Sequence, residues 1–342
     1  MRPAFRPALV NGPTGDPALY VDFVFQRRAL LFDMGDLAAL PTRKLLRVSE
    51  AFLSHAHMDH FMGFDQLLRV LVGRERTVRL YGPPGLIGQV AGRLRAYTWN
   101  LVDRFEAELR FVVTEYHGHG WGRRARLRLG TGFALEAEGP CRLPGGVLLE
   151  EPGLRVRAAV LDHGIPCLGF VLEEGLHVNV WRNRLEELGL DVGPWLQALK
   201  RGVLEGRPEE EPVPVRWLPG RSGPPVLPLG ELRRRVLRVV PGQRIGYLTD
   251  LAGHAANRRA AAALVRGADL LYIECPFPHR EAARAADRRH LTARQAGLIA
   301  RAAAVQRVVP FHLSPRHQEE AEALVAELEA VWRGEAGLSA PA

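Results

Sequence analysis

Three histidines and one aspartate lie within six residues of each other in the segment SHAHMDH, residues 54–60. His55 and His57 are two positions apart, directly after a short apolar run, so in an extended segment both side chains point the same way and can bind one cation. Asp59 and His60 follow in the turn and can face a neighbouring cation. Zinc takes imidazole nitrogens and carboxylate oxygens in sites of about four ligands, and a catalytic site keeps one position open for water. The segment therefore predicts half of a metal site, whose remaining ligands must come from elsewhere in the chain.

Three other polar residues follow segments that read as buried strands. His163 lies in VLDHGIPCLGF after the strand 156–160, Asp250 ends IGYLTD, and His312 lies in VVPFHLS. Each has an ordinary alternative when taken alone, because a histidine after a strand is commonly a surface residue and an aspartate can cap a helix. The spacing predicts strand-end positions for all three residues, and strand ends are where the missing ligands are expected.

Two further residues could take part without binding a metal. His290 lies in RRHLTARQAG just before a predicted helix, and Glu274 ends the buried strand LLYIE. His117 and His119 in YHGHGW repeat the spacing of His55 and His57. A pair of histidines two residues apart is therefore weak evidence by itself, and the longer HxHxDH cluster is much more specific.

The composition is ordinary for a globular protein, with 47% hydrophobic and 25% charged residues in 342. The formal charge of +8 comes almost entirely from arginine, and the abundance of Ala, Gly and Pro beside it indicates a coding bias, so the charge favours an anionic partner only mildly. The three cysteines form no CxxC pair, which favours a reducing cytoplasm. No apolar run is long enough to cross a bilayer and the first residues lack a signal-peptide core, so we expect a cytoplasmic protein without a membrane partner.

Strands and helices alternate over the second half of the chain, which is typical of a layered α/β domain. Residues 205–230 are rich in Pro, Gly and Glu and predict a loop or arm outside the core. The clearest predicted helices are 257–267, 292–305 and 318–332, and 64–71 and 86–94 are also periodic enough for helices. Predicted strands include 51–53, 245–248, 270–273 and 308–311, and 29–32 is a short apolar run. No repeat or linker is evident, so the sequence predicts one domain with an inserted arm.

Together these motifs resemble the metallo-β-lactamase superfamily and, more narrowly, the tRNase Z (ribonuclease Z) family. SHAHMDHFMGF, followed by YGPPGL, matches the family's metal motif, and LLFDMGD resembles its strand ending in Asp-x-Gly. The segments VLDHGIPCLGFVLEE, IGYLTD, LLYIECPF, RRHLTARQAGLIA and VVPFHLSPRH continue the match through most of the chain. LEELGLDVGPWLQALKRG resembles the tRNA-binding arm, with the Gly-Pro motif at Gly193 and Pro194.

The resemblance implies a four-layer αββα sandwich in one domain over residues 1–342, with the inserted arm at 177–230. It also implies a dinuclear centre in which zinc is the expected metal, although Mn or Fe suits the same ligands. The implied ligands are His55, His57 and His163 for one ion, Asp59, His60 and His312 for the other, and Asp250 as a bridge. His290 is the implied proton donor to the leaving oxygen, with Glu274 as its partner, and Asp59 is also a candidate for water deprotonation. Ser314 and Arg316 are candidates for gripping a phosphate, and a solvated loop is an equal alternative for them.

The implied function is cleavage of the 3′ trailer of precursor tRNA by metal-activated water, and the implied assembly is a homodimer. Two alternatives stay open at this point. One is a hydrolase of the same fold that acts on a small phosphodiester, sulfate ester or other ester. This alternative suits an arm in which Arg207 is followed by three glutamates, Glu209, Glu210 and Glu211. The other is a non-catalytic RNA-binding relative, against which the full set of metal-binding residues argues.

Overall fold

The computed structural model describes residues 5–24 and 26–335, which fall into two compact units. The larger unit comprises Met1–Glu173 and Gln243–Ala342, and the smaller unit is Glu174–Gly242, inserted between them in the sequence. The arm expected at 177–230 lies within the smaller unit. Each unit has its own hydrophobic core.

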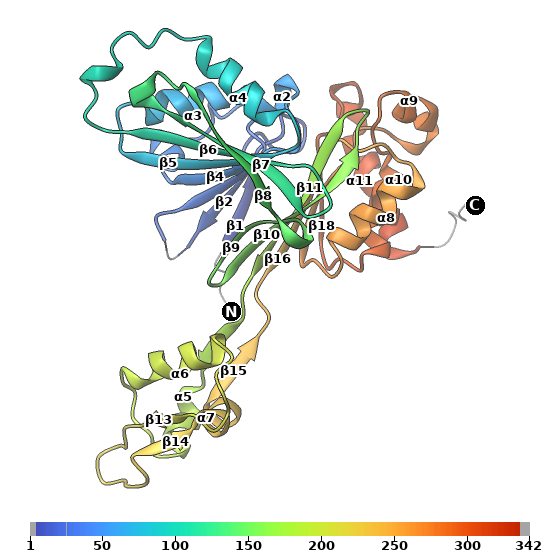
Figure 1. The fold of residues 1–342 in the computed structure, drawn as a ribbon. Helices are drawn as coiled ribbons and strands as arrows, with labels where there is room; N and C mark the ends of the chain where they lie inside the picture. Colours follow the sequence, from blue (N-terminus) through green and yellow to red (C-terminus); the bar gives the residue numbers. More distant parts are fainter. Residues whose placement is uncertain (1–4, 25, 336–342) are drawn as a thin grey trace. The chain divides into compact units, whose positions relative to one another are not determined.

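The larger unit contains two sheets (Figure 1). The eight-stranded sheet follows the chain in the order β1 (Phe5–Leu9), β2 (Leu19–Phe23), β3 (Ala29–Phe32), β4 (Val48–Phe52), β5 (Arg76–Gly82), β6 (Leu109–Tyr116), β7 (Trp121–Arg128) and β8 (Leu135–Arg142). The six-stranded sheet has the order β18 (Val308–Phe311), β17 (Leu270–Glu274), β16 (Arg244–Leu248), β11 (Pro166–Glu174), β10 (Leu154–Asp162) and β9 (Val147–Glu151). Strands β3 to β6 are parallel, as are β16 to β18, so within each group the carboxyl ends lie along one edge.

Helices lie outside both sheets, as Figure 1 shows for α3 and α4 on one side and α8, α10 and α11 on the other. The helices of the larger unit are α1 (Thr42–Leu45), α2 (Met58–Phe61), α3 (Phe64–Leu71), α4 (Leu86–Arg95), α8 (Ala255–Leu264), α9 (Ala282–Asp287), α10 (Ala293–Ala302) and α11 (Ala321–Arg333). The bounds of α3 are the expected ones, 64–71. The helix expected at 318–332 is α11, which begins later, at Ala321, because residues 315–320 form a 3₁₀ turn. Thr292 caps α10 through a capping box with Gln295.

The alternation of side chains along the buried strands explains the layers. Leu31 of β3 faces the core under α3 and α4, whereas its neighbours Leu30 and Phe32 face the core between the sheets. In the same way Tyr272 of β17 faces the core between the sheets, whereas Ile273 faces the core under α8, α10 and α11. Strands buried on both faces need such continuous apolar runs. The predicted four-layer αββα fold is confirmed.

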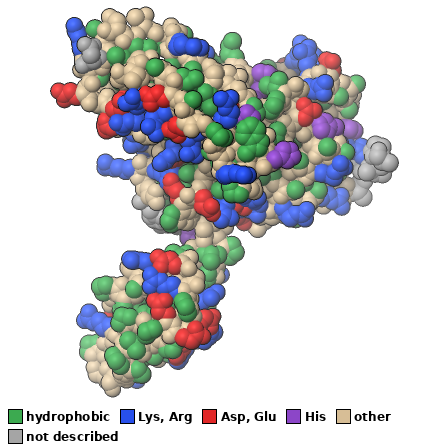
Figure 2. All heavy atoms as spheres, in the orientation of Figure 1, with side chains coloured by type: hydrophobic (Ala, Val, Ile, Leu, Met, Phe, Trp, Pro, Cys, Tyr) green, Lys and Arg blue, Asp and Glu red, His purple; other side chains and the backbone are tan. Residues whose placement is uncertain are grey.

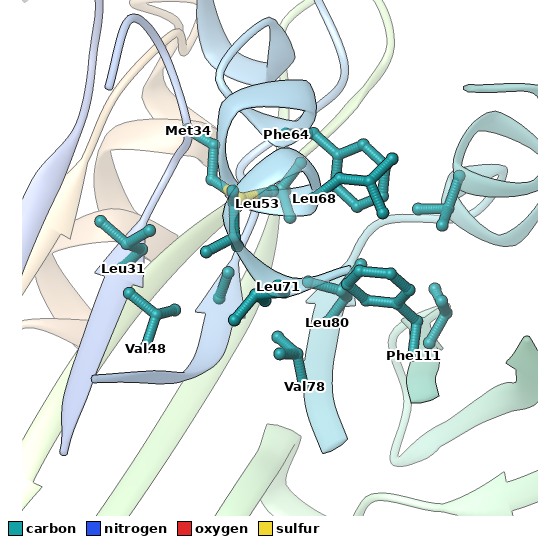
Figure 3. Close-up of a cluster of buried hydrophobic side chains, with 14 of the residues drawn as sticks. Leu31, Met34, Val48, Leu53, Phe64, Leu68, Leu71, Val78, Leu80 and Phe111 are labelled. Atoms are coloured by element: carbon teal, nitrogen blue, oxygen red, sulfur yellow. The ribbon is translucent and has the colours of Figure 1, made fainter. Parts of the chain in front are cut away.

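Figure 3 shows the core between the first sheet and its helices. Phe64, Leu68 and Leu71 of α3 point toward the strand side chains Val78 and Leu80 of β5. All five side chains are at most 3% exposed. This packing fixes α3 on the face of the first sheet, and with it the preceding segment that carries the histidine cluster.

The smaller unit has more structure than the predicted loop over 205–230. It consists of β12 (His177–Val180), α5 (Arg182–Glu187), α6 (Trp195–Leu204), β13 (Pro212–Pro214), β14 (Val226–Pro228), α7 (Leu229–Val236) and β15 (Leu237–Val240). Val213 and Leu229 are buried in a cluster with Leu199 of α6 and Leu232 of α7. Most of 205–230 has no helix or strand, as expected of a loop or arm, but β13, β14 and the start of α7 lie within it. The few spaced apolar residues among Pro, Gly and Glu suffice to close a small core.

Candidate metal centre

Every residue that the sequence proposed as a metal ligand lies at or just after the end of a strand or on the short helix beside it. His55 and His57 follow β4, and Asp59 and His60 are on α2. His163 directly follows β10, Asp250 is the second residue after β16, and His312 directly follows β18. The strand ends of both sheets therefore deliver these side chains to one edge of the sandwich.

The carboxylate of Asp250 lies at the centre of this cluster. Its Oδ2 is 3.5 Å from His55 Nε2, 3.3 Å from His60 Nε2 and 3.5 Å from His163 Nε2. Its Oδ1 is 2.9 Å from His312 Nδ1. One group of possible ligand atoms consists of His55, His57, His163 and Asp250, a second of Asp59, His60 and His312, and a third of Asp250, Glu274, His290 and His312. In each group the atoms lie within 4.8 Å of one another.

The donor set fits a metal ion better than a network of hydrogen bonds. The Nε2 atoms of His55 and His60 are buried, and neither has a hydrogen-bond partner among the described residues. A buried polar atom without a partner destabilises a fold by about 1–3 kcal/mol. Both nitrogens instead point at the Asp250 carboxylate from 3.3–3.5 Å, which is too long for a good hydrogen bond but leaves these atoms free to coordinate a cation.

Asp33 contacts the histidine cluster on the side away from Asp250. It is fully buried, and its Oδ2 lies 2.9 Å from His60 Nδ1 and accepts a 2.9 Å hydrogen bond from the Tyr247 hydroxyl. Its Oδ1 accepts the backbone N–H of Ser54 at 2.7 Å. A carboxylate on the far nitrogen of a ligating histidine fixes the ring and its tautomer. The sequence assigned no role to Asp33, although the Asp-x-Gly that ends its strand was a usable signal.

Three residues of the centre have a left-handed backbone that side chains other than glycine rarely adopt. The φ angles are +56° at Asp33, +50° at Asp250 and +53° at His312. Such a conformation costs of order 1–3 kcal/mol per residue and persists where the surroundings impose it. All three residues come within two positions of a strand end, so the turn directs each side chain toward the centre.

His290 and Glu274 form a pair beside the cluster. His290 Nδ1 lies 2.7 Å from Glu274 Oε2, and the other oxygen of Glu274 accepts the backbone N–H groups of Leu251 and Leu291. Glu274 is fully buried, whereas the His290 side chain is 18% exposed. The His290 ring centroid is 5.0 Å from that of His163 and 5.8 Å from that of His312. Because Nδ1 faces Glu274, the Nε2 atom is the one available to a reactant.

The protonation states of the candidate ligands differ from one side chain to the next. Burial lowers the pKa of His55 to about 2, so its ring is neutral, which is the form that coordinates metals. Burial by itself raises the pKa of Asp250, but the charges of His312 and His60 lower it by more, and the carboxylate is held well below its usual range. Burial by itself also lowers the pKa of His60 and His312, but the charge of Asp250 raises both by more, to about 10 for His60 and well above the ordinary value for His312. The carboxylate thus holds these two rings as imidazolium, and binding of a metal ion to them would release their protons.

Comparison with known proteins supports this interpretation. No family model matches the chain. The chain is 36% identical over 319 residues to ribonuclease Z of Deinococcus radiodurans, covering 91% of each chain. The chain belongs to the ribonuclease Z family. It is also 30% identical to ribonuclease Z of Myxococcus xanthus, covering 89% of this chain and 84% of the relative.

The fold comparison agrees with the family. The metallo-β-lactamase fold protein YhfI of Bacillus subtilis superposes with a TM-score of 0.53 at 15% identity, covering 96% of this chain and 94% of YhfI. The expected ribonuclease Z resemblance and metallo-β-lactamase fold are thus confirmed. As a ribonuclease Z family member, the protein is a metal-dependent hydrolase of RNA phosphodiester bonds.

The other proposed contact residues of this ribonuclease Z family member are not among the possible metal ligands. Ser314 and Arg316 follow His312, and the Ser314 hydroxyl accepts the backbone N–H of Arg316 at 3.4 Å. Gly193 and Pro194 lie in the smaller unit at the start of α6. None of the four is in a group of possible metal ligands among the described residues.

The remaining histidine pair has a structural environment of its own. His117 Nε2 lies 3.0 Å from Glu115 Oε2, and its ring stacks on Trp121 at 4.3 Å between centroids. Neither His117 nor His119 belongs to a possible metal-ligand group in the described part of the chain. The weak evidence that their spacing offered therefore leads to no second centre.

No helix within residues 5–24 and 26–335 is both long and apolar enough to cross a bilayer.

Proposed function

We propose that the protein is a dinuclear zinc endoribonuclease that removes the 3′ trailer of precursor tRNA. The observation that carries this proposal is the convergence of the two ligand groups on Asp250, with the His290–Glu274 pair beside them, in a chain 36% identical to a ribonuclease Z. Phosphodiester hydrolysis needs charge neutralisation, an activated water molecule and a proton for the leaving oxygen. This arrangement can provide all three.

The ligand assignment follows the two groups. His55, His57 and His163 would hold one zinc ion. Asp59, His60 and His312 would hold the second, and Asp250 would bridge the two, since its carboxylate faces members of both groups. The chemistry that two zinc ions supply in such sites is activation of water at neutral pH and neutralisation of phosphate charge.

The protein's own residues supply the proton transfers. We assign the proton donor for the departing 3′ oxygen to His290, whose Nε2 is left free by the contact of Nδ1 with Glu274. Glu274 is a positioning residue, because its own oxygens are occupied by His290 and by two backbone N–H groups. Asp59 is 44% exposed and lies 3.4 Å from His312 Nε2, so it touches both the ligand group and solvent and can accept a proton from water.

Contacts to the RNA are assigned to two places. Ser314 and Arg316 follow His312 closely enough to contact a phosphate next to the scissile bond. Gly193 and Pro194 are assigned to tRNA contact through the smaller unit. Figure 2 shows basic and acidic side chains interspersed over that unit. Arg207 is paired with Glu205 and Glu211, so it contributes little free positive charge.

The assembly, the compartment and the metal complete the proposal. We assign the chain to a homodimer, which would have twice the 37.9 kDa mass of one chain in light scattering. We assign it to the cytoplasm, where the free thiols of Cys141, Cys167 and Cys275 stay reduced. Reconstitution with Zn, Mn or Fe in turn, followed by metal analysis and assay, identifies the metal that supports the highest activity.

The test is an assay of the zinc-loaded protein on precursor tRNA with a 3′ trailer, run in parallel with bis-p-nitrophenyl phosphate. Release of the trailer at the discriminator end supports the proposal. The paired charges of the smaller unit favour a second candidate, hydrolysis of a small phosphodiester. Cleavage of bis-p-nitrophenyl phosphate without trimming of the precursor would select that candidate, and failure to cleave either substrate would contradict both.

A further inference from the structure

A basic cavity lies in the larger unit, outside the candidate metal centre. It has a volume of about 810 Å³. Its charged lining consists of Arg27, Arg43, Lys44, Arg47, Arg76 and Asp22. Five cationic side chains thus surround it against one carboxylate.

The cavity lies at the opposite end of the first sheet from the metal centre. Arg47 immediately precedes β4 and Arg76 begins β5, so both mark the amino ends of these parallel strands. The histidine cluster follows the carboxyl end of β4. Five residues of β4 separate the two ends, a span of roughly 17 Å at about 3.3 Å per residue. The cavity is therefore not part of the metal centre.

The protein neutralises only a small part of the positive charge in the cavity. The single acid, Asp22, is paired with Arg47 at 2.9 Å. Arg27 and Arg43 are exposed and have no ion pair among the described residues, and Lys44 Nζ lies 5.1 Å from the centre of the Tyr20 ring. Many other arginines of the chain face a carboxylate, so this concentration is more than a consequence of the arginine-rich composition.

Two guanidinium groups of the lining are fixed in place by backbone carbonyls. Arg47 Nη2 donates to Gln26 O at 2.7 Å, and Arg76 Nη2 donates to Leu46 O at 2.9 Å. The Nε atom of each is buried and has no hydrogen-bond partner within the described residues. The lining therefore combines two guanidinium groups held by the protein with three cationic side chains that have no ion pair in the described part of the chain, a chemistry that suits a phosphate group.

We propose that this cavity is a second phosphate-binding site, through which the protein holds the backbone of its RNA substrate at a distance from the scissile bond. Neutralising backbone phosphates with Arg and Lys releases counterions and supplies affinity without sequence preference. The identity of the ligand as substrate RNA rests on the proposed function, whereas the binding of phosphate rests on the cavity alone.

The test replaces together the three lining cations that have no ion pair among the described residues, as Arg27→Gln, Arg43→Gln and Lys44→Gln. These side chains make no hydrogen bond that the fold needs, and Arg43→Gln alone at an exposed position serves as a milder second variant. The matched control is Arg69→Gln, Arg259→Gln and Arg266→Gln, which removes the same charge from exposed positions of the larger unit. All proteins are zinc-loaded and compared on precursor tRNA and on bis-p-nitrophenyl phosphate at several salt concentrations.

We expect the cavity variant to raise the KM for precursor tRNA about tenfold or more and to leave turnover of bis-p-nitrophenyl phosphate unchanged. Each lost phosphate contact reduces the slope of log affinity against log salt by about 0.7–0.9, so the triple variant should flatten it by about 2. Arg43→Gln should change log KM for precursor tRNA and the salt slope by about a third as much as the triple variant does. A cavity variant that matches the control variant on precursor tRNA would overturn the assignment to RNA.

Calorimetric titration with inorganic pyrophosphate separates the two parts of the proposal. Pyrophosphate binding that is weaker in the cavity variant than in the control would support a phosphate site. If the KM for precursor tRNA is unchanged at the same time, RNA is rejected as the ligand of that site. Equal pyrophosphate binding in the two variants would reject the phosphate site. If the wild type cleaves no precursor tRNA, the proposed function fails, and the pyrophosphate comparison still decides whether the cavity binds phosphate.

Discussion

His290 Nδ1 and Glu274 Oε2 lie 2.7 Å apart, and the second oxygen of Glu274 is held by two backbone N–H groups. The carboxylate therefore cannot turn away from the imidazole, and the imidazole presents Nε2 outward. We propose that this arrangement orients His290 as a proton donor and not as a metal ligand, although His290 and Glu274 also form a group of possible ligand atoms with Asp250 and His312. The distinction between donor and ligand can be tested directly.

His290→Ala should retain its full metal content and lose about 10²–10⁴-fold in turnover of precursor tRNA, which is the usual contribution of a general acid. Glu274→Gln should lower turnover less, because the ring loses its charged partner but stays in the site. Metal analysis and single-turnover rates provide the measurements. His119→Asn is the control, since His119 is exposed and asparagine tolerates its φ of +50°. Loss of metal in His290→Ala would instead make His290 a ligand.

Asp33→Asn should weaken the binding of one metal ion by about 10–100-fold, as expected when a carboxylate behind a ligating histidine is lost. The amide cannot supply the negative charge that faces His60 Nδ1. Tyr247→Phe removes only one of the hydrogen bonds to Asp33 and should have a smaller effect. Competition with a chromophoric chelator measures both affinities. Equal affinities for wild type and Asp33→Asn would show that Asp33 has no positioning role.

Zinc should stabilise the protein against heat in a concentration-dependent way, because the ligand groups are assembled in the fold and absent from the unfolded chain. A thousandfold excess over the Kd corresponds to about 4 kcal/mol. Asp250→Asn, which removes the carboxylate that faces His55 and His163 of one group and His60 and His312 of the other, should lose most of this zinc-dependent shift in Tm. The comparison is made by calorimetry with and without chelator. A shift in Asp250→Asn as large as in wild type would contradict the bridging role.

Glu173 gives a pH dependence of stability away from the metal centre. Burial raises its pKa, but the two hydrogen bonds and charge of Arg157, with the charge of Arg244, lower it by more, so the net pKa is below the usual value. A lowered folded-state pKa contributes stability above the unfolded-state pKa, near 4.3, and this contribution is lost as pH falls through the folded-state pKa.

Glu173→Gln should therefore be less stable than wild type at pH 7, by about 1 kcal/mol because the pair is partly exposed, and the difference should shrink below about pH 4. Urea unfolding at both pH values measures the difference. Glu150→Gln breaks an exposed pair with Arg155 and serves as the control, with little change at either pH. If the loss of unfolding free energy in Glu173→Gln were larger at low pH than at pH 7, the pH dependence assigned to Glu173 would have the wrong sign.

The fold and the meeting of the candidate ligands at one edge could be predicted from the sequence because both depend on short, local signals. A buried apolar strand followed by His or Asp, as at Leu248 to Asp250, places that side chain at the edge of a sheet whatever the distant context. The role of Asp33 could not be predicted in this way. Its contacts to His60 and Tyr247 join residues 27 and 214 positions apart, and no local pattern indicates such a pairing.

The smaller unit was harder to predict for a different physical reason. Its core residues are few and are separated by Pro, Gly and Glu, so no window is periodic enough to indicate β13 or the start of α7. The basic cavity is likewise absent from any single motif, because Arg27, Arg43 and Arg76 come together only when β2, α1 and β5 are in place.

The measurement that tests the central claim most directly is a cleavage assay of precursor tRNA in which the bound zinc of the same preparation is counted. The account predicts two zinc ions per chain, release of the 3′ trailer by wild type, and loss of both zinc and cleavage in Asp250→Ala. A protein that binds two zinc ions and leaves the precursor intact would contradict the assigned reaction. Full cleavage by Asp250→Ala would contradict the assigned centre.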